Sequence, residues 1–267
     1  METQADTTYT ATRVAARPRE FVGVRGPDAE SYLQAVVTND VERLGPGETC
    51  EALLLTPKAR VVAPMVVLRR AADDYLLLTE PGLGERLRAA LLRSRFAAKC
   101  EIELEQHTSA VVLGAAEGIP TSDYGVEAVE VLDGDLEPTI ADDELELLRI
   151  RAGTPRPGKE IDDRVLPAEA GLDVRAIDFA KGCYVGQEPV ARQHYRGRVN
   201  RSLRVLALEG TELPEYDAEL MREGKPVGRV TSAARDGDGV SALGYVRAEV
   251  PADAVLDLGG RAARQLS

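Results

Sequence analysis

The sequence predicts an α+β fold that ends in a small β-barrel. Helix-like and strand-like patterns are mixed over the first two-thirds of the chain, and short alternating segments separated by glycine turns follow Asn200. Short strands at close spacing are typical of barrels and sandwiches. With 267 residues, of which 44% are hydrophobic, the chain is long enough to bury a large core. We therefore expect an α+β region over residues 1–199 and a β-barrel domain over residues 200–267.

The α+β region begins with a pattern of strands that pack against helices. An apolar run at 21–24 indicates a strand, and Gly26-Pro27-Asp28 then opens a helix, with proline at its first position. Apolar residues from Ala29 to Val37 recur on one face of that helix. Further strands are expected at 51–55, 61–68, 75–79, 100–105, 111–113 and 128–132, and further helices at 85–96 and 142–151. The alternation of Ile102 and Leu104 with glutamates predicts a strand with one buried face.

The last third of the chain contains five short segments with the alternation of strands. They lie at 203–208, 219–221, 227–231, 242–246 and 254–258. Gly224-Lys225-Pro226 and the segment Arg235-Asp236-Gly237-Asp238-Gly239 supply turns between them. This regular spacing is the reason for expecting a barrel.

The charge balance argues against two broad classes of partner. The formal net charge is -12 and the isoelectric point is about 4.8. Sequence-independent binding to nucleic acid or to an anionic membrane rests instead on a basic surface. The start, Met1-Glu2-Thr3-Gln4-Ala5-Asp6, has no basic segment or apolar run, and charges interrupt every later apolar run before it reaches membrane-spanning length. We expect a cytoplasmic protein without a nucleic-acid or membrane partner.

The cysteines and histidines are few and far apart. They are Cys50, Cys100, Cys183, His107 and His194. An odd number of widely spaced cysteines implies no disulfide framework and fits a reducing compartment. No pair has the Cys-x-x-Cys spacing typical of zinc or iron–sulfur sites. We therefore expect no metal cofactor.

The densest group of reactive side chains lies between Lys181 and Gly197. This signature segment reads KGCYVGQEPVARQHYRG, with charged, amide, thiol and aromatic groups placed between glycines. Its defining residues are Lys181, Gly182, Cys183, Tyr184, Gly186, Gln187, Glu188 and Arg192. A catalytic interpretation makes Cys183 a thiolate whose pKa is lowered by Lys181 and by a helix that begins near Gln187.

Two other interpretations of the signature segment need no nucleophile. In a binding site, its glycines let the main chain approach a flat ligand, and Gln187 and Glu188 pair with the edge of the ligand ring. Tyr184 or Tyr195 then offers an aromatic face. In a structural loop, the segment packs between two domains and Cys183 acts as a small buried side chain.

The signature segment resembles that of the YgfZ-type folate-binding proteins, which are relatives of the T protein, the aminomethyltransferase of the glycine cleavage system. Other motifs agree in order and spacing: Gly26-Pro27-Asp28, QAVVTND at 34–40, LTPKAR at 55–60, RIRAGTP at 149–155 and LPAEAGL at 166–172. The resemblance therefore covers nearly the whole chain. It implies a folate-binding body of intertwined α+β subdomains around a central channel, followed by a β-barrel.

The resemblance also implies a cofactor, partners and a role. The cofactor is tetrahydrofolate or another reduced folate, and the role is support of iron–sulfur cluster assembly or repair. Iron–sulfur client enzymes or assembly factors are the implied partners. The residues expected to contact the folate are Arg151, Glu169, Tyr184, Gln187, Glu188, Arg192 and Tyr195. Lys181 and Cys183 are the candidate functional residues, and no residue is assigned a catalytic role.

Two positions depart from the aminomethyltransferase pattern. The T proteins carry a pair of aspartates on the strand after the Pro-Lys turn, and the matching residues here are Ala63 and Pro64. Neither carries a charge or a side-chain hydrogen-bonding group, so we expect aminomethyl transfer to be lost. Arg151 stands where the superfamily commonly places a glutamate that grips the pterin edge, and a guanidinium can only donate.

Three arrangements of Arg151 are open. It can point away from the ligand and leave Glu169, Gln187 or Glu188 as the acceptor. It can instead meet a carboxylate, such as a folate glutamyl tail or another anion. Finally, it can be a surface arginine at the end of a helix, where a cation suits the helix dipole.

Two other functions are compatible with the sequence. A folate-dependent one-carbon transferase or demethylase would turn over a methylamine donor, and the lack of carboxylates at Ala63 and Pro64 counts against it. A ligand-free interaction module would use the signature segment to dock a client protein.

Overall fold

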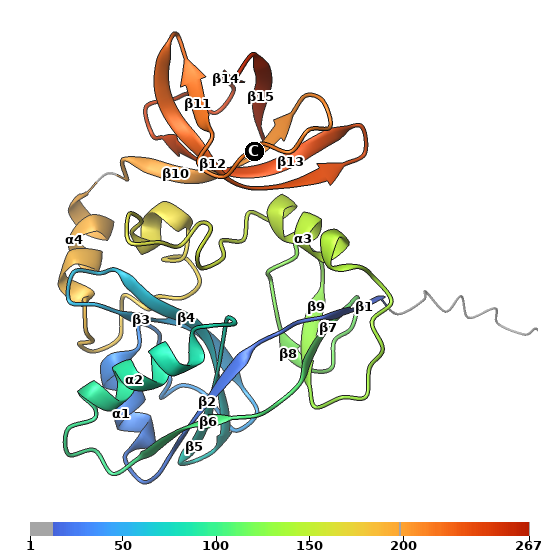
Figure 1. The fold of residues 1–267 in the computed structure, drawn as a ribbon. Coiled ribbons are helices and arrows are strands. Elements are labelled where there is room, and N and C mark those ends of the chain that lie inside the picture. Colours follow the sequence, from blue (N-terminus) through green and yellow to red (C-terminus); the bar gives the residue numbers. More distant parts are fainter. Residues whose placement is uncertain (1–12, 198, 267) are drawn as a thin grey trace, which may run out of the picture.

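Five antiparallel strands form the first sheet, in the order β3-β4-β5-β2-β6 (Figure 1). The computed structural model describes residues 13–197 and 199–266. The strands are β2 (Glu20–Arg25), β3 (Thr49–Leu55), β4 (Val61–Ala71), β5 (Asp74–Thr79) and β6 (Glu101–Glu105). Each overlaps a predicted strand. Residues 1–6, in which no export signal is expected, lie outside the described residues.

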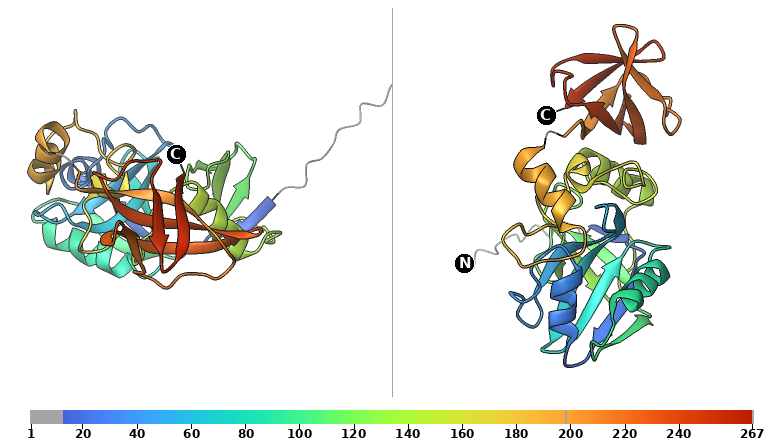
Figure 2. Two further views of the ribbon diagram at one scale, coloured as in Figure 1. Left: turned by 90° about the horizontal axis from the view of Figure 1, so that it is seen from above. Right: turned by 90° about the vertical axis from the view of Figure 1, so that its left-hand side faces the viewer.

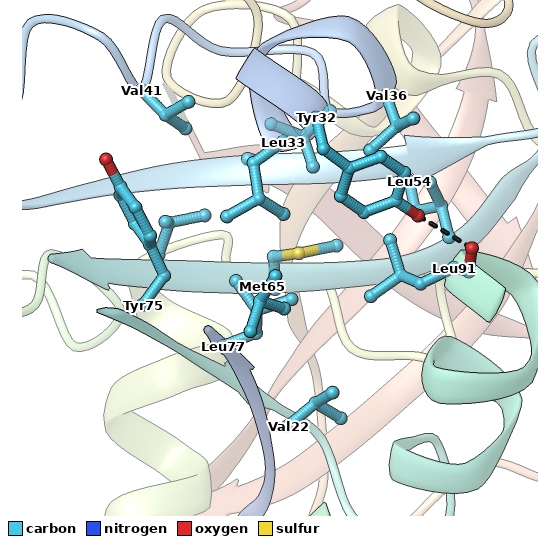
Figure 3. Packing of buried hydrophobic residues seen from close by; sticks show 14 of the residues in the cluster. Val22, Tyr32, Leu33, Val36, Val41, Leu54, Met65, Tyr75, Leu77 and Leu91 are labelled. Carbon is cyan, nitrogen blue, oxygen red and sulfur yellow. Dashed lines mark hydrogen bonds between the residues drawn. The ribbon is translucent and has the colours of Figure 1, made fainter. Parts of the chain in front are cut away.

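Two helices, α1 (Ala29–Val36) and α2 (Gly84–Ser94), cover one face of this sheet. Tyr32 of α1 and Met65 of β4 belong to the same cluster of buried side chains (Figure 3). The Tyr32 hydroxyl donates a hydrogen bond to the Leu91 carbonyl oxygen at 2.7 Å, which ties α1 to α2. Burial of the apolar faces of both helices against one sheet face builds the core of this subdomain.

Two local expectations are corrected here. Helix α1 begins at Ala29 with Asp28 as its N-cap, so Pro27 precedes the helix and does not occupy its first position. Leu104 is 45% exposed, although Ile102 on the same strand is buried. The difference arises because Leu104 lies near the end of the edge strand β6, outside the buried cluster beneath the helices.

A second sheet has four strands in the order β1-β7-β9-β8. Its strands are β1 (Arg13–Ala16), β7 (Ser109–Leu113), β8 (Ile119–Pro120) and β9 (Ala128–Leu132). Ile119 packs against Phe21 and Leu76 on the face of the first sheet that the two helices leave open. Helix α3 (Asp142–Arg151) has the predicted bounds and packs Leu145 against the second sheet.

The carboxyl-terminal strands close into a barrel in the order β10-β13-β12-β11-β14-β15. They are β10 (Arg201–Leu208), β11 (Glu219–Arg222), β12 (Lys225–Asp236), β13 (Gly239–Arg247), β14 (Val255–Leu258) and β15 (Arg261–Leu266). Strand β15 is not predicted, because half of its residues are polar and they do not alternate with the apolar ones. The barrel stacks on the body above α3 and the connecting segment (Figure 2).

A long connection between α3 and β10 lies against both the body and the barrel. It contains the short 3-10 helix η1 (Pro167–Ala170) and helix α4 (Gln187–Arg196), which begins at the predicted residue. Leu53 of β3, Tyr184 of the connection and Tyr245 of β13 belong to one buried cluster. The signature segment therefore lies where the sheet, the connection and the barrel meet.

Candidate functional site

A pocket of about 750 Å³ lies between the first sheet, helix α3 and the segment at 156–163. A smaller cavity of about 50 Å³ shares four lining residues with it. The shared residues are Pro64, Glu80, Pro157 and Ile161. We refer to the two spaces together as the central cavity. Val61, Leu83 and Leu145 add apolar wall to its larger part.

Two arginines and two glutamates form a buried ion network beside the central cavity. Arg17 Nη1 donates to Glu80 Oε2 at 3.0 Å, and Arg19 Nη1 donates to Glu80 Oε1 at 2.7 Å. Arg19 Nε also donates to Glu130 Oε2 at 3.1 Å. Both arginines lie in the link between β1 and β2, Glu80 follows β5, and Glu130 belongs to β9. The network therefore joins the two sheets at the wall of the cavity.

Glu80 is held as a carboxylate. Burial alone would raise the pKa of Glu80, but the hydrogen bond from Arg17 and the charges of Arg17 and Arg19 outweigh it and lower that pKa to about 2. Because Glu80 lines both parts of the central cavity, its charged oxygens are hydrogen-bond acceptors at that wall throughout the physiological pH range.

Arg17 offers an unpaired donor next to this acceptor. Its side chain is 7% exposed and lines the larger pocket. Its Nε atom is buried and has no hydrogen-bond partner among the described residues. The Glu130 Oε1 oxygen lies 3.7 Å from Arg17 Nε, which is beyond hydrogen-bond length. A buried donor without an acceptor is costly, so Arg17 Nε is an unsatisfied donor beside the cavity wall.

A second group of charges lines the smaller part of the central cavity. Arg175 Nε lies 2.9 Å from Glu51 Oε2, and Arg175 Nη2 donates to Asp123 Oδ1 at 3.0 Å. Burial raises the pKa of Glu51, against the opposing effect of Arg175. Glu51, Asp123 and Arg175 all line this part of the cavity, so it has further polar groups that a ligand edge could meet.

The two positions matched to the T-protein aspartates face different sides of β4. Ala63 is fully buried in the cluster beneath α1 and α2. Pro64 lines both parts of the central cavity. Only position 64 therefore faces the space in which a ligand would bind, and the proline ring supplies apolar wall there.

Lys181 is buried at the start of the signature segment. Its Nζ donates to the carbonyl oxygens of Val37 and Asn39, each at 2.7 Å, and lies 5.6 Å from the centre of the Tyr184 ring. Burial lowers the pKa of Lys181 to about 8. No hydrogen bond joins Lys181 to Cys183 in the part of the chain that the structure describes. Lys181 thus ties the segment to the chain that follows α1, and its action on the Cys183 thiol stays a prediction.

Gly186 packs against the turn between β3 and β4. It adopts a φ of +85°, and a Cβ atom at this position would lie 2.6 Å from the Thr56 carbonyl oxygen. The neighbouring Tyr184 is buried, and burial raises its pKa to about 12. Glycine is therefore required at 186 both by backbone conformation and by close approach.

Most of the remaining signature side chains lie at the surface. Cys183, Glu188, Arg192 and Tyr195 are exposed, and Gln187 is partly exposed with a 3.5 Å hydrogen bond to the Gly182 carbonyl oxygen. His194 stacks on Phe179 with ring centroids 3.8 Å apart. The side chain of Arg196 lies outside what the structure describes.

Glu169 and Arg151 both bind protein groups. Glu169 is buried, where Oε2 accepts from the Leu166 amide at 3.0 Å and from Arg201 at 3.2 Å. Arg151 pairs with Asp236 of the barrel through Nε at 2.9 Å. None of the seven residues expected to contact folate lines the central cavity. Their role in binding folate stays a prediction.

Apart from Pro64, the residues that line the cavity were not identified from the sequence as site residues. Arg17 and Arg19 flank Pro18 just before a predicted strand, and Glu80 and Pro81 follow another. Charged residues next to prolines at strand ends were the available signal, but such residues are also common in solvent-exposed loops. Only the packing of the two sheets shows that these charges are buried together.

Two features of the described residues bear on cofactors and partners. Within 13–197 and 199–266, no group of three or more His, Cys, Asp and Glu side chains is arranged to hold a metal ion. No helix in this part of the chain is long and apolar enough to cross a membrane.

Comparison with known sequences gives a consistent set of relatives. A family model described as the GCVT N-terminal domain matches residues 19–130. The iron-sulfur cluster assembly factor IBA57 homolog, mitochondrial, of Pyricularia oryzae is 30% identical, and the alignment covers 92% of this chain and 74% of that protein. The tRNA-modifying protein YgfZ of Edwardsiella ictaluri is 27% identical, with 92% of this chain and 87% of that protein covered.

Comparison with solved structures supports the fold. The crystal structure of the glycine cleavage system aminomethyltransferase T from Bartonella henselae matches with a TM-score of 0.78 at 19% identity. The match covers 96% of this chain and 84% of that chain. At this identity the likeness shows the fold, and it confirms the predicted α+β body with a terminal β-barrel.

Proposed function

The chain belongs to the YgfZ-type family of GcvT-like proteins, and from this premise we propose that it is a cytoplasmic tetrahydrofolate-binding accessory protein that supports iron–sulfur cluster assembly or repair. The names of its relatives support the role, since one is an iron–sulfur cluster assembly factor homolog and another a tRNA-modifying protein. In this proposal its partners are iron–sulfur client enzymes or assembly factors.

The central cavity is the observation that carries the folate part of the proposal. The volume of its larger part, about 750 Å³, lies in the range of small-molecule sites. A reduced pterin presents N–H donors and a carbonyl acceptor on its edge, so the Glu80 carboxylate can accept from it and Arg17 Nε can donate to it. Pro64, Leu83 and Ile161 offer apolar walls for the ring system. The side chains present therefore fit the group.

The proposal assigns binding and orientation to the chain's own residues. Tetrahydrofolate, when bound, supplies the capacity to carry a one-carbon unit. Arg17 and Glu80 orient the pterin edge, and Arg19 holds Glu80 in place through its hydrogen bond of 2.7 Å. Pro64 gives the cavity wall no charge at the position matched to a T-protein aspartate, so the proposal is binding without aminomethyl transfer.

Isothermal titration with tetrahydrofolate tests the folate part. We expect the wild type to bind and Arg17→Lys to bind about tenfold more weakly, because lysine keeps the charge but lacks the Nε donor. Arg25→Lys is the matched control, since Arg25 is half-exposed on β2 and pairs with Asp74 and Glu105, away from the cavity. Circular dichroism confirms that each variant folds. No detectable heat from the wild type at millimolar ligand would overturn the folate proposal.

Enzyme assays in cells test the iron–sulfur part. In cells that lack the chain, we expect reduced activity of [4Fe–4S] enzymes and unchanged activity of enzymes without clusters. Wild-type chain should restore the lost activity, and Arg17→Lys should restore less of it. Unchanged activity of the cluster enzymes in the deletion strain would contradict this role.

A further inference from the structure

The wall of the larger pocket is rich in carboxylates. Its charged lining consists of Glu80, Asp142, Asp143, Glu146, Asp162 and Asp163 against Arg17, Arg86 and Arg156. The formal balance of this lining is therefore negative by three charges. Folates themselves carry carboxylates on their glutamyl tails, so the sign of this lining bears on which folates the cavity accepts.

The unpaired carboxylates lie at the outside of the pocket. Glu80 is paired with Arg17, and Glu146 lies 3.1 Å from Arg156. Asp142, Asp143 and Asp163 are exposed, and none of them forms an ion pair with another described residue. We call these three aspartates the acidic rim. They lie in the first turn of α3 and in the segment that follows Asp162.

The paired and unpaired charges set the direction in which a folate enters. The inner wall holds the buried Arg17 side chain, with its unpaired Nε, next to the Glu80 carboxylate. These two groups suit the edge of a pterin, which presents both donors and acceptors. A pterin bound there directs the rest of the molecule outward, so the glutamyl tail leaves the pocket past the acidic rim.

We propose that the acidic rim makes the cavity selective for reduced folates with one glutamate or none over folates with a poly-γ-glutamyl tail. This inference rests on the proposed function, since it requires a folate in the central cavity. Each further glutamate adds a carboxylate, and like charges at a partly exposed surface repel by an amount that salt reduces. The deep donor and acceptor contribute equally to all tail lengths. The exposed charges of the lining therefore separate the ligands, and there the three rim aspartates outnumber the exposed Arg86.

Titration of the purified protein with tetrahydrofolate monoglutamate and triglutamate at low salt measures the selectivity directly. We expect the triglutamate to bind about three- to tenfold more weakly than the monoglutamate, from repulsion typical of exposed charges. The ratio of the two dissociation constants should approach one at roughly 1 M salt, where the screening length falls to about 3 Å.

Charge-neutralising variants test whether the acidic rim causes the difference in affinity between the two ligands. The double variant Asp142→Asn and Asp143→Asn should bring the two ligands closer in affinity, mainly by improving triglutamate binding. Because both aspartates lie at the positive end of α3, this variant can also lose helix stability. Asp163 lies outside any helix, so Asp163→Asn tests the role of the acidic rim without changing the charge at the start of α3. Asp135→Asn and Asp253→Asn are the matched controls, since both are exposed and neither lines the pocket.

The outcomes separate this inference from the proposal on which it rests. Binding of the monoglutamate with a weaker triglutamate, equalised by the rim variants, supports the inference. Equal or tighter binding of the triglutamate overturns it and leaves folate binding intact. Binding of neither ligand overturns both.

Discussion

Arg151 on α3 and Asp236 on β12 form a bidentate ion pair that joins the body to the barrel. Arg151 Nε donates to Asp236 Oδ2 at 2.9 Å, and Nη2 donates to Oδ1. Asp236 also accepts from the Ser241 hydroxyl at 2.5 Å. Arg151 is the last residue of α3, its side chain is half-exposed, and it does not line the central cavity. Of the three arrangements open to Arg151, the structure therefore shows the surface arginine at a helix end, paired with a carboxylate of the chain itself.

Replacing Arg151 should affect stability slightly and folate binding very little. The pair is half-exposed, so Arg151→Ala should lower the free energy of unfolding by about 0.5–1 kcal/mol in urea titration. Arg222→Ala, which removes an exposed pair with the adjacent Glu223, serves as the control. Tetrahydrofolate affinity should change by less than about twofold. A tenfold loss in affinity would instead place Arg151 at the ligand.

Glu80 should make stability depend on acidity. Its pKa is lowered from 4.5 to about 2 in the folded chain, so its contribution is fully present above pH 4.5 and is lost as the pH falls towards 2. Glu80→Gln removes the negative charge and one of the two acceptor oxygens that two buried guanidinium groups share, and should cost about 2–4 kcal/mol at pH 7. The difference in the free energy of unfolding between the wild type and Glu80→Gln should decrease as the pH falls from 4.5 to 2.

Urea denaturation at pH 7, 4.5 and 3 measures this narrowing. Glu85→Gln is the control, since Glu85 is well exposed on α2 and its pair with Arg88 is long, at 3.3 Å. If the difference in unfolding free energy between the wild type and Glu80→Gln stays constant from pH 7 to pH 3, the pKa of Glu80 is not lowered in the folded chain.

Gly186 and Gly182 give a matched pair within the signature segment. Gly186→Ala places a Cβ 2.6 Å from the Thr56 carbonyl oxygen at a φ of +85°, and we expect a loss of about 2 kcal/mol or more in the free energy of unfolding. At Gly182 a Cβ has no neighbour within 4 Å, and Gly182→Ala should change stability by less than about 0.5 kcal/mol. If both substitutions lower the free energy of unfolding equally in chemical denaturation, the signature segment does not pack at Gly186 on the turn between β3 and β4.

Lys181 should make the stability of the folded chain depend on pH in the alkaline range. Burial lowers its pKa from 10.5 to about 8, so the unfolded chain binds the proton more strongly than the folded chain between these values. Wild-type stability should therefore rise relative to Lys181→Met as the pH increases from 8 to 10.5, by at most about 3 kcal/mol. The comparison with the variant cancels the titration of the buried tyrosines. A difference that does not vary with pH would argue against a buried ammonium.

Thiol labelling should distinguish Cys183 from the other two cysteines. Cys183 is exposed, whereas Cys100 is buried and Cys50 is partly buried. Burial raises the pKa of both, that of Cys50 to about 12. Alkylation of the native protein at pH 8 should modify Cys183 at least about tenfold faster than the others. Cys183→Ser should remove the fast phase, and a fast phase that persists would identify another thiol as the accessible one.

The secondary structure was largely predictable because its signals are local. The apolar spacing from Ala29 to Val36 and the acidic start of the helix at Asp142 depend only on neighbours along the chain. Strands β1, β8 and β15 were missed for a related reason. The four residues of β1, the two of β8 and the half-polar sequence of β15 carry little periodicity, and pairing with other strands defines them instead.

The sequence by itself determined the signature segment, the family resemblance and the order of helices and strands, since each depends on residues that are close together along the chain. Only the tertiary structure decided that Arg17 and Glu80 lie together at a cavity, that Arg151 pairs with Asp236, and that Lys181 points to the carbonyls of Val37 and Asn39. These contacts join residues 63, 85, 144 and 142 positions apart. Burial and pairing of charges depend on which elements, far apart in the sequence, pack together. Patterns among neighbouring residues do not indicate this packing.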